Sequence, residues 1–183
     1  MSRKTQEIIN LSRDCMASMV PSGARILLHA GTEVVIVQDR GGSYTVNVYG
    51  NLARIEAHEA DALGKEVHDP LQDLPADASL QDKIKVQLKT CYDPEISLNI
   101  MELGLIYNCM TKEDSAHTGH YLITIIMTLT SPGCGMGDVI ADEVKKKIEA
   151  IAEVTSCEMA IVFDPPWERE MMSESARLQL GML

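Results

Sequence analysis

The spacing of apolar and polar residues follows two different patterns along this chain, and the change of pattern divides the chain into two regions. In the first region, short runs of β-branched and apolar residues are separated by glycine-rich reversals such as Gly31-Thr32. Four such runs occur, at 25–30, 33–38, 44–49 and 52–55. This pattern predicts an antiparallel group of strands, followed by a helical turn at 57–63. A short helix is predicted before them over 5–19, because apolar residues recur there every three or four positions.

From Ser79 onward the pattern changes to alternating helices and strands. Leu80, Ile84 and Leu88 recur every four residues behind the capping pair Ser79 and Asp82, which predicts a helix that ends near residue 90. A hairpin, a second amphipathic helix starting near residue 138 and a third strand follow, with the strands expected at 104–110, 120–129 and 157–162. The predicted fold class is α+β: a C-terminal α-β-β-α-β two-layer domain with an N-terminal small antiparallel β-rich unit.

The proline- and aspartate-rich stretch between the two regions indicates a linker. We expect an N-terminal unit containing the first helix and the β unit over 1–66, a linker at 67–78, the α+β domain at 79–163 and a tail at 164–183. In the tail, Trp167, Met171 and Met172 are predicted to belong to a docking surface for a subunit or client, with the methionines on one side of a short amphipathic helix. The alternative is that Asp164-Pro-Pro-Trp167 simply leaves the last strand and Trp167 covers an edge of the core.

Composition and charge narrow the classes of partner. The chain has 183 residues, 45% of them hydrophobic, which predicts a globular protein with a real core. Its formal charge of −11 argues against binding nucleic acid or an anionic membrane. No apolar run approaches the length that spans a bilayer, so a cytoplasmic location is expected. The five cysteines are widely spaced and the five histidines form no close ligand pair, so reduced thiols are expected in place of a disulfide framework or a local zinc site.

One cysteine stands apart because of the turn around it. Cys134 lies between a predicted strand and a predicted helix, in a loop that leaves its sulfur accessible and near the positive end of the helix dipole. A lowered thiol pKa is therefore expected, which makes Cys134 the candidate reactive residue. The supporting loop consists of Thr130, Ser131, Pro132, Gly133, Gly135 and Gly137. A phosphate-binding or nucleotide-binding loop fits poorly because Asp138 follows the last glycine, and the remaining alternative is a buried cysteine in a glycine-rich chain reversal.

Three carboxylates occur among apolar residues after the first C-terminal helix: Asp93, Glu95 and Glu102. If the sheet brings this segment beside the second helix, Glu102 or Asp93 would face Cys134 and help to hold a hard cation. The alternative is that Asp93 and Glu95 cap backbone amides of a turn around Pro94.

Four ordered motifs resemble the small domain of iron–sulfur cluster maturation factors. They are Asp93-Pro-Glu95, Asn99-Ile-Met-Glu-Leu-Gly-Leu-Ile-Tyr107, Met127-Thr-Leu-Thr-Ser-Pro-Gly-Cys134 and Val162-Phe-Asp-Pro-Pro-Trp167. Segments 38–46, 61–64 and 167–181 are further similar to the two-part bacterial members of that family. The resemblance covers nearly the whole chain, and it implies a two-layer fold like that of the NifU C-terminal domain.

The resemblance implies an auxiliary, non-enzymatic role in which assembled clusters reach client proteins or stay on them. The resemblance places Cys134 at the position of the family's reactive cysteine, and it places Asp93, Glu95 and Glu102 at the family's acidic positions. It also implies a transient iron–sulfur cluster and a homodimer. The implied partners are the assembly machinery and client apo-proteins. One thiolate supplies a single ligand to a cluster that usually takes four, so the partner of a symmetric dimer, carboxylates, a small thiol or another protein would have to complete the shell. Two alternatives remain: a thiol enzyme with Cys134 as nucleophile, and a pure adaptor of a multicomponent assembly.

Overall fold

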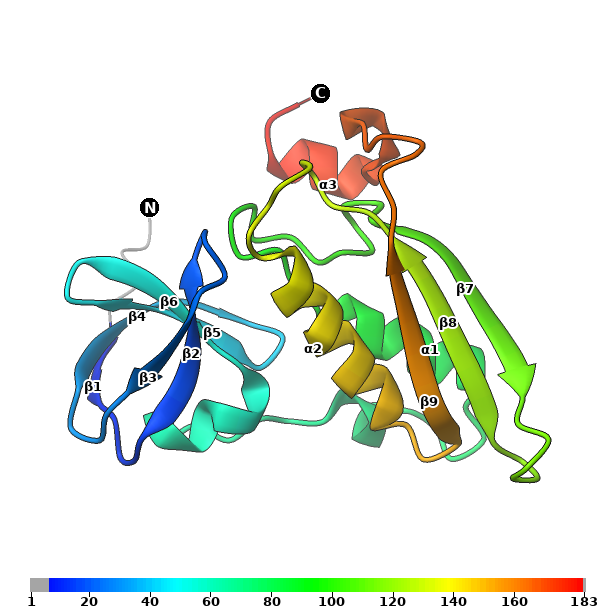
Figure 1. The fold of residues 1–183 in the computed structure, drawn as a ribbon, viewed down its shortest axis with the longest axis horizontal. Coiled ribbons are helices and arrows are strands. Elements are labelled where there is room, and N and C mark those ends of the chain that lie inside the picture. The colour runs from blue at the N-terminus through cyan, green and yellow to red at the C-terminus, as the bar shows by residue number, and fades with distance from the viewer. Residues whose placement is uncertain (1–6, 183) are drawn as a thin grey trace. The chain divides into compact units, whose positions relative to one another are not determined.

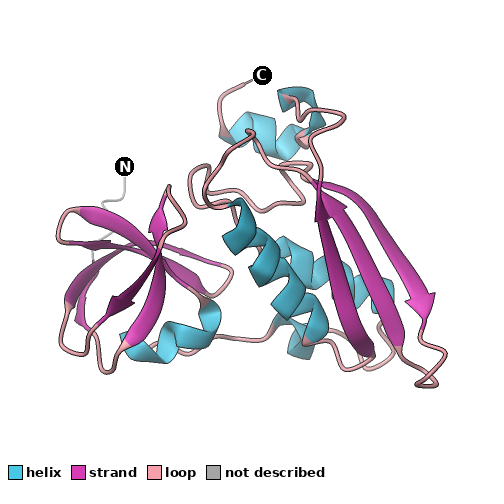
Figure 2. Ribbon diagram, in the orientation of Figure 1, coloured by secondary structure: helices cyan, strands magenta, loops and turns pink. Residues whose placement is uncertain are grey.

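The computed structural model describes residues 7–182 and divides the chain into two compact units, Met1–His68 and Asp69–Leu183. Figure 1 follows the chain through both units, and Figure 2 shows that strands dominate the first unit, whereas the second combines helices and strands. The predicted α+β class is confirmed. No helix within residues 7–182 is long and apolar enough to cross a membrane.

Unit 1 is an antiparallel sheet of six strands in the order β1-β4-β5-β6-β2-β3. The strands are β1 (Glu7–Asn10), β2 (Cys15–Val20), β3 (Arg25–Leu28), β4 (Glu33–Arg40), β5 (Ser43–Val48) and β6 (Asn51–Ile55). A 3-10 helix, η1 (Ala57–Leu63), follows β6 and buries Ala60, Ala62 and Leu63 in the same core as Val34, Val46 and Ile55 of the sheet. This core of unit 1 is continuous, because every strand except β1 contributes at least one buried apolar residue to it.

The helix predicted over 5–19 is wrong for every residue that the structure describes, since β1 and β2 occupy this region. Residues 5 and 6 of that prediction lie outside the described residues. In β2, Cys15 and Ala17 are buried while Met16 between them is less so, which is the two-residue period of a strand. Pairing with β3 on one side and β6 on the other satisfies the backbone of β2, and in a segment of six residues this pairing favours a strand over a helix.

Unit 2 contains the expected α-β-β-α-β order. Its elements are α1 (Leu80–Lys89), β7 (Ile106–Glu113), β8 (Tyr121–Met127), α2 (Gly137–Glu149) and β9 (Val154–Ile161). A 3-10 turn, η2 (Pro70–Asp73), precedes them, and η3 (Arg169–Met171) and α3 (Glu174–Gln179) follow. The first helix begins as predicted. The side chain of Ser79 accepts a hydrogen bond from the Asp82 N–H, and the side chain of Asp82 accepts one from the Ser79 N–H, which completes a capping box.

The sheet of unit 2 has the order β7-β8-β9, with β7 and β8 antiparallel and β8 and β9 parallel. Helix α2 connects the two parallel strands and packs on β9, while α1 packs on α2 (Figure 2). Residues Ile123, Ile125 and Met127 of β8 are buried on the helix-covered face together with Ile140 and Ile148 of α2. The ends of β8 and β9 and the start of β7 consequently lie at one end of the sheet, and the connections there form the candidate site.

Candidate functional site

The cysteine loop, residues 130–137, runs from the end of β8 into α2. Cys134 lies in a tight turn, in which its N–H donates to the Ser131 carbonyl at 3.4 Å and its carbonyl accepts from the Gly137 N–H at 3.1 Å. Gly133 has a φ of 83°, a backbone conformation that favours glycine. Ser131, Pro132, Gly133 and Gly135 are exposed, and Cys134 itself is partly exposed. Cys134 is therefore partly accessible, in a turn whose neighbouring residues are exposed.

Two buried residues pack this loop against the rest of the domain. Met136 is 0% exposed, and Gly137 is buried where a Cβ would come within 2.4 Å of Leu129 Cδ1. Gly137 is thus required for close packing of the helix start against the end of β8, which is a different use of glycine from a phosphate cradle.

The pKa of the Cys134 thiol is raised above its ordinary value, so the expected lowering is wrong. Burial of the sulfur is the largest cause, and the negative charges of Glu95 and Asp93 act in the same direction. The N–H groups of Met136 and Gly137 at the start of α2 bond to the sulfur and oppose the rise. The helix terminus therefore acts as predicted, but desolvation and the nearby carboxylates outweigh it.

The acidic loop, residues 92–98, brings two of the three predicted carboxylates toward the thiol. Asp93 is 4% exposed, and its Oδ1 accepts from the N–H of Glu95 at 2.8 Å and from that of Ile96 at 3.0 Å. It therefore caps the turn around Pro94, which the sequence left as the alternative interpretation. Glu95 is exposed on the same turn. Both carboxylates are near enough to the sulfur to influence its pKa.

Glu102, the third carboxylate, belongs to a different cluster. Its side chain accepts from the Ser173 hydroxyl, while the Ser173 N–H donates to the Glu102 carbonyl at 2.9 Å. Its own N–H donates to Asn99 Oδ1 at 2.8 Å. The structure thus joins Glu102 to the C-terminal tail, whereas Asp93 and Glu95 act on Cys134.

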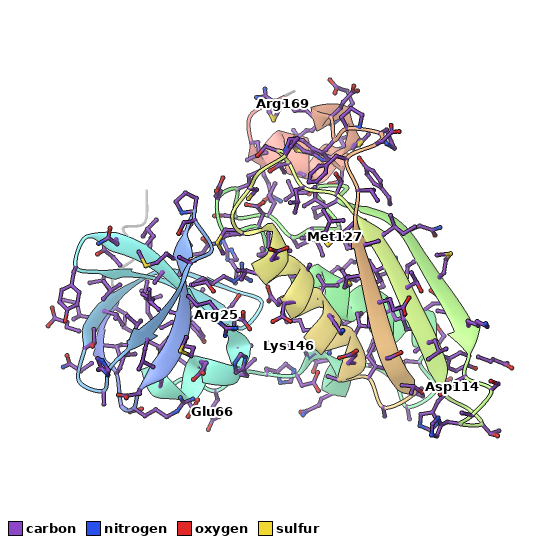
Figure 3. All side chains as sticks on the ribbon, in the orientation of Figure 1. Arg25, Glu66, Asp114, Met127, Lys146 and Arg169 are labelled. Carbon is purple, nitrogen blue, oxygen red and sulfur yellow. The ribbon has the colours of Figure 1, made fainter. Side chains whose placement is uncertain are left out.

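The tail, residues 164–182, packs against residues 99–107, which we call the anchor segment. Trp167 Nε1 donates to the Leu103 carbonyl at 2.8 Å, and the Tyr107 hydroxyl donates to the Pro165 carbonyl at 2.9 Å. Figure 3 shows labelled Arg169 of the tail beyond the sheet end where labelled Met127 lies, opposite Asp114 in the β7–β8 hairpin. The tail thus packs on its own domain, in line with the alternative interpretation that Asp164-Pro-Pro-Trp167 leaves the last strand and Trp167 covers an edge of the core.

Of the predicted docking residues in the tail, Met172 is buried, whereas Trp167 and Met171 are partly exposed. Met172 is 5% exposed, Met171 contacts the Tyr107 hydroxyl through its sulfur at 3.6 Å, and the helix predicted to carry both begins only at residue 174. Ser173, which caps α3 by accepting from the Ala176 N–H at 3.0 Å, was missed by sequence reasoning. A serine three residues before an alanine-containing turn was the available signal.

The other cysteines differ from Cys134 in their surroundings. Cys15, Cys91 and Cys157 are buried, and Cys109 is partly exposed within β7. Burial raises the pKa of Cys157 to about 12. Among residues 7–182, no group of three or more His, Cys, Asp or Glu side chains is arranged to hold a metal ion. Cys134 therefore offers one sulfur ligand in the chain as described.

Comparisons with known proteins match this domain to a family. A family model described as iron-sulfur cluster assembly protein matches residues 81–159, which lie within unit 2. An Fe-S protein maturation auxiliary factor of Porphyromonas gingivalis is 40% identical over 103 residues, which cover 56% of this chain and 92% of that protein. The auxiliary factor YitW of Bacillus subtilis is 40% identical over 104 residues, 57% of this chain and 96% of that one.

A third relative, the auxiliary factor SufT of Staphylococcus aureus, is 40% identical over 90 residues, covering 49% of this chain and 96% of its own. A solved structure of a domain of unknown function from Bacillus anthracis has 35% identity and a TM-score of 0.47, covering 57% of this chain and 93% of that one. The family resemblance inferred from the motifs is confirmed by relatives that match over almost their whole length. These relatives cover 56 and 57% of this chain, so the further similarity of segments 38–46, 61–64 and 167–181 stays a prediction. The chain belongs to the family of iron–sulfur cluster assembly proteins to which these maturation auxiliary factors belong.

Proposed function

We propose that this chain is an auxiliary factor of iron–sulfur protein maturation in the bacterial cytoplasm. In this proposal, Cys134 either binds the cluster transiently as a ligand or contacts the partner protein that carries it. The three relatives support the process, because each carries the name of an Fe-S protein maturation auxiliary factor. The partly exposed Cys134, whose neighbours Ser131, Pro132, Gly133 and Gly135 are exposed, carries the assignment of the residue.

The surroundings of the sulfur suit transient ligation. A raised pKa keeps the free thiol protonated near neutral pH, so the sulfur binds iron only by releasing its proton. The N–H groups of Met136 and Gly137 then stabilise the thiolate, and Glu95 and Asp93 favour a cationic metal beside it. One thiolate out of the usual four ligands holds a cluster weakly, which allows its transfer once a partner or client supplies the remaining ligands.

The surroundings also favour a carrier over a thiol enzyme. A nucleophilic cysteine usually has a neighbouring base and a lowered pKa, whereas burial and two carboxylates raise the pKa of Cys134. The histidine nearest in sequence is His120, which belongs to the hairpin at the start of β8, at the opposite end of the strand from the cysteine loop. We therefore propose a role without catalytic turnover.

Anaerobic reconstitution with iron and sulfide tests this function. The wild-type protein is compared with Cys134→Ala and with the matched control Cys109→Ala, which removes the other partly exposed thiol. We expect bound iron, bound sulfide and thiolate-to-iron absorption in the wild type and the control, and their loss in Cys134→Ala. Equal cluster content in all three proteins would show that Cys134 is not a ligand.

A transfer assay separates ligation from partner contact. A holo-scaffold and an apo-client are mixed with each variant, and the rate of cluster arrival on the client is followed by its absorption. Acceleration by wild type and by Cys109→Ala, with loss for Cys134→Ala, supports the proposal even if no cluster stays on the isolated chain. Acceleration that survives Cys134→Ala would make the protein an adaptor that works without this thiol.

A further inference from the structure

The outer face of the unit 1 sheet carries a row of apolar residues that the proposed function does not use. Val34, Val46 and Ala53 belong to the core of unit 1, so the residues that alternate with them along β4, β5 and β6 lie on the opposite face. On that face the strand registers align one residue from each of five neighbouring strands. We call them the outer row, and they are Ile8, Val35, Asn47, Leu52 and Val20.

The outer row is accessible to another molecule. Ile8 is 63% exposed and Leu52 is 39% exposed, while Val20 and Val35 are partly exposed. Four strand spacings of about 4.8 Å separate the first and last residues of the row, which therefore crosses about 19 Å of the sheet. Single apolar residues on a surface need no explanation, whereas aligned ones form a patch that another protein surface can cover.

The turn beside the outer row presents a tyrosine at a position that favours a different residue. Strands β5 and β6 are joined by Tyr49 and Gly50, with Val48 and Asn51 as the closing pair. Tyr49 has a φ of 50° and Gly50 a φ of 83°, and positive values at both central residues are the pattern of a type I′ turn. Asn-Gly suits this turn best, because a bulky side chain at positive φ is strained.

Contacts within the chain do not compensate this strain, since Tyr49 is 84% exposed. Strain that is retained without a packing reason points to a function of the side chain. An exposed tyrosine also offers a large apolar ring and a hydroxyl, the combination that anchors many protein interfaces.

Hydrogen bonds hold this turn in one conformation. The Gly50 N–H donates to Oδ1 of Asn47, the polar member of the outer row, at 3.0 Å. Asn51 Nδ2 donates to the Tyr49 carbonyl at 3.3 Å. Strands β5 and β6 lie in the middle of the six-stranded sheet, with a neighbouring strand on each outer side. The tyrosine is therefore presented by a preorganised support, which lowers the entropic cost of a contact.

We propose that Tyr49 and the outer row form the docking surface for an apo-client, the protein that receives the cluster. The identity of this partner rests on the proposed function. Unit 1 lies outside residues 81–159, which the family model matches, so the process shared by the family belongs to unit 2. Unit 1 adds a property of its own to that process, and a strained, exposed tyrosine beside an apolar row assigns it to the choice of client.

Charge defines the chemistry of the client surface. Glu33 is exposed and lies two residues from Val35 along β4, on the same outer face, whereas the outer row and Tyr49 contribute no cation. The complementary surface is therefore an apolar groove that takes the tyrosine ring, with a lysine or arginine beside it that faces Glu33. A second copy of the chain fits less well, because its outer row brings the same carboxylate and its formal charge is −11.

Thermal unfolding of Tyr49→Asn separates binding from folding. Asparagine tolerates a positive φ, so this variant should melt about 2 to 4 °C above wild type although it has lost the ring. Circular dichroism measures the transition. A melting temperature below that of wild type would show that the tyrosine is kept for stability, and it would overturn the proposal.

Binding is measured by biolayer interferometry between the full-length protein and a set of iron–sulfur proteins from the same bacterium, each stripped of its cluster. For the apo-proteins that bind, Tyr49→Asn and Leu52→Asp should each raise the dissociation constant about tenfold. Glu33→Lys should raise it about threefold. Leu178→Ala removes an exposed apolar side chain of α3 in unit 2 and is the matched control, which should leave the dissociation constant unchanged. Circular dichroism confirms that each variant folds.

Reconstitution with iron and sulfide keeps this proposal distinct from the proposed function. Tyr49→Asn should take up as much iron and sulfide as wild type, and Cys134→Ala should bind the apo-proteins as wild type does. The docking surface is refuted if wild type binds none of the apo-proteins, or if Tyr49→Asn and Leu52→Asp bind them unchanged. Row-dependent binding of the holo-scaffold alone, or a dimer of this chain that Leu52→Asp abolishes, would equally overturn it, because another partner would then occupy the outer row.

Discussion

Two segments at the same end of the unit 2 sheet, the cysteine loop and the anchor segment, use glycine in opposite ways. Gly133 in the cysteine loop has a φ of 83°, and a Cβ built on it meets nothing within 4 Å. Gly104 in the anchor segment has a φ of 70°, and a Cβ there would lie 2.2 Å from the Met171 carbonyl oxygen. The first glycine leaves space around a thiol, and the second allows the tail to pack on the domain.

This contrast distinguishes motif residues that influence the thiol from motif residues that stabilise the fold. Both segments belong to the motifs that carried the resemblance, and the anchor segment contains Glu102, a carboxylate that the sequence grouped with Cys134. The charges of Glu95 and Asp93 raise the pKa of the thiol, while Glu102 and Trp167 form hydrogen bonds between the tail and the anchor segment. Substitutions in the cysteine loop should therefore change reactivity, and those in the anchor segment should change stability.

The largest expected effect follows from Gly104→Ala. The methyl group collides with the backbone of Met171 and forces a left-handed conformation on a non-glycine residue, at a cost of about 3 kcal/mol or more in the free energy of unfolding. Urea denaturation followed by the fluorescence of Trp167, the single tryptophan of the chain, measures it. The paired variant Gly133→Ala has the same backbone cost without the collision and should lose about 1 kcal/mol. Equal losses would refute the contrast between the two segments.

Trp167→Ala should cost about 2 to 3 kcal/mol, because it removes the partly buried ring and its hydrogen bond to the Leu103 carbonyl. Trp167→Phe retains most of the ring contact and should lose about 1 kcal/mol. Thermal unfolding monitored by circular dichroism compares the two variants. A tail that contributes nothing to stability would leave both melting temperatures at the wild-type value.

Ser173→Ala removes the cap of α3 and the hydroxyl bonded to Glu102, with an expected loss of about 1 to 2 kcal/mol. Ser175→Ala, two residues further at an exposed position of the same helix, should stay within about 0.5 kcal/mol of wild type. Chemical denaturation of both proteins at the same pH makes the comparison. Similar losses in the two would mean that the Ser173 contacts do not stabilise the tail.

Glu95→Gln should have the smallest effect on stability and a distinct effect on chemistry. Glu95 is exposed and its charge raises the pKa of Cys134, so neutralising it lowers that pKa and increases the thiolate fraction at a given pH. The rate of alkylation of Cys134 at pH 8 should rise roughly two- to threefold, with stability unchanged. Glu102→Gln is the control in the anchor segment and should leave the alkylation rate unchanged. Rates measured from pH 7 to 10 should show the Glu95→Gln profile shifted to lower pH, and a shift in the other direction would contradict the electrostatic assignment.

The prediction of the fold from sequence was most accurate where local signals were complete. The capping pair at Ser79 and Asp82, the hairpin, and the apolar stripe of α2 each occur close to where they were expected. The first helix was wrong because Cys15 and its neighbours form a short apolar run whose spacing fits a helix as well as a strand. Only pairing with the next strand, β3, and with β6, which is distant in sequence, distinguishes the two.

The candidate site divides in the same way. The sequence determined that a lone thiol lies in an open turn between a strand and a helix, because glycine, proline and apolar periodicity act through neighbouring residues. Tertiary structure decided which carboxylates accompany it, and it reversed the direction expected for the pKa of Cys134, because desolvation and charge depend on segments about 40 residues away in the chain. It also seated the tail on the anchor segment, since a hydrogen bond such as that from Trp167 to Leu103 joins residues 64 positions apart, which no local pattern specifies.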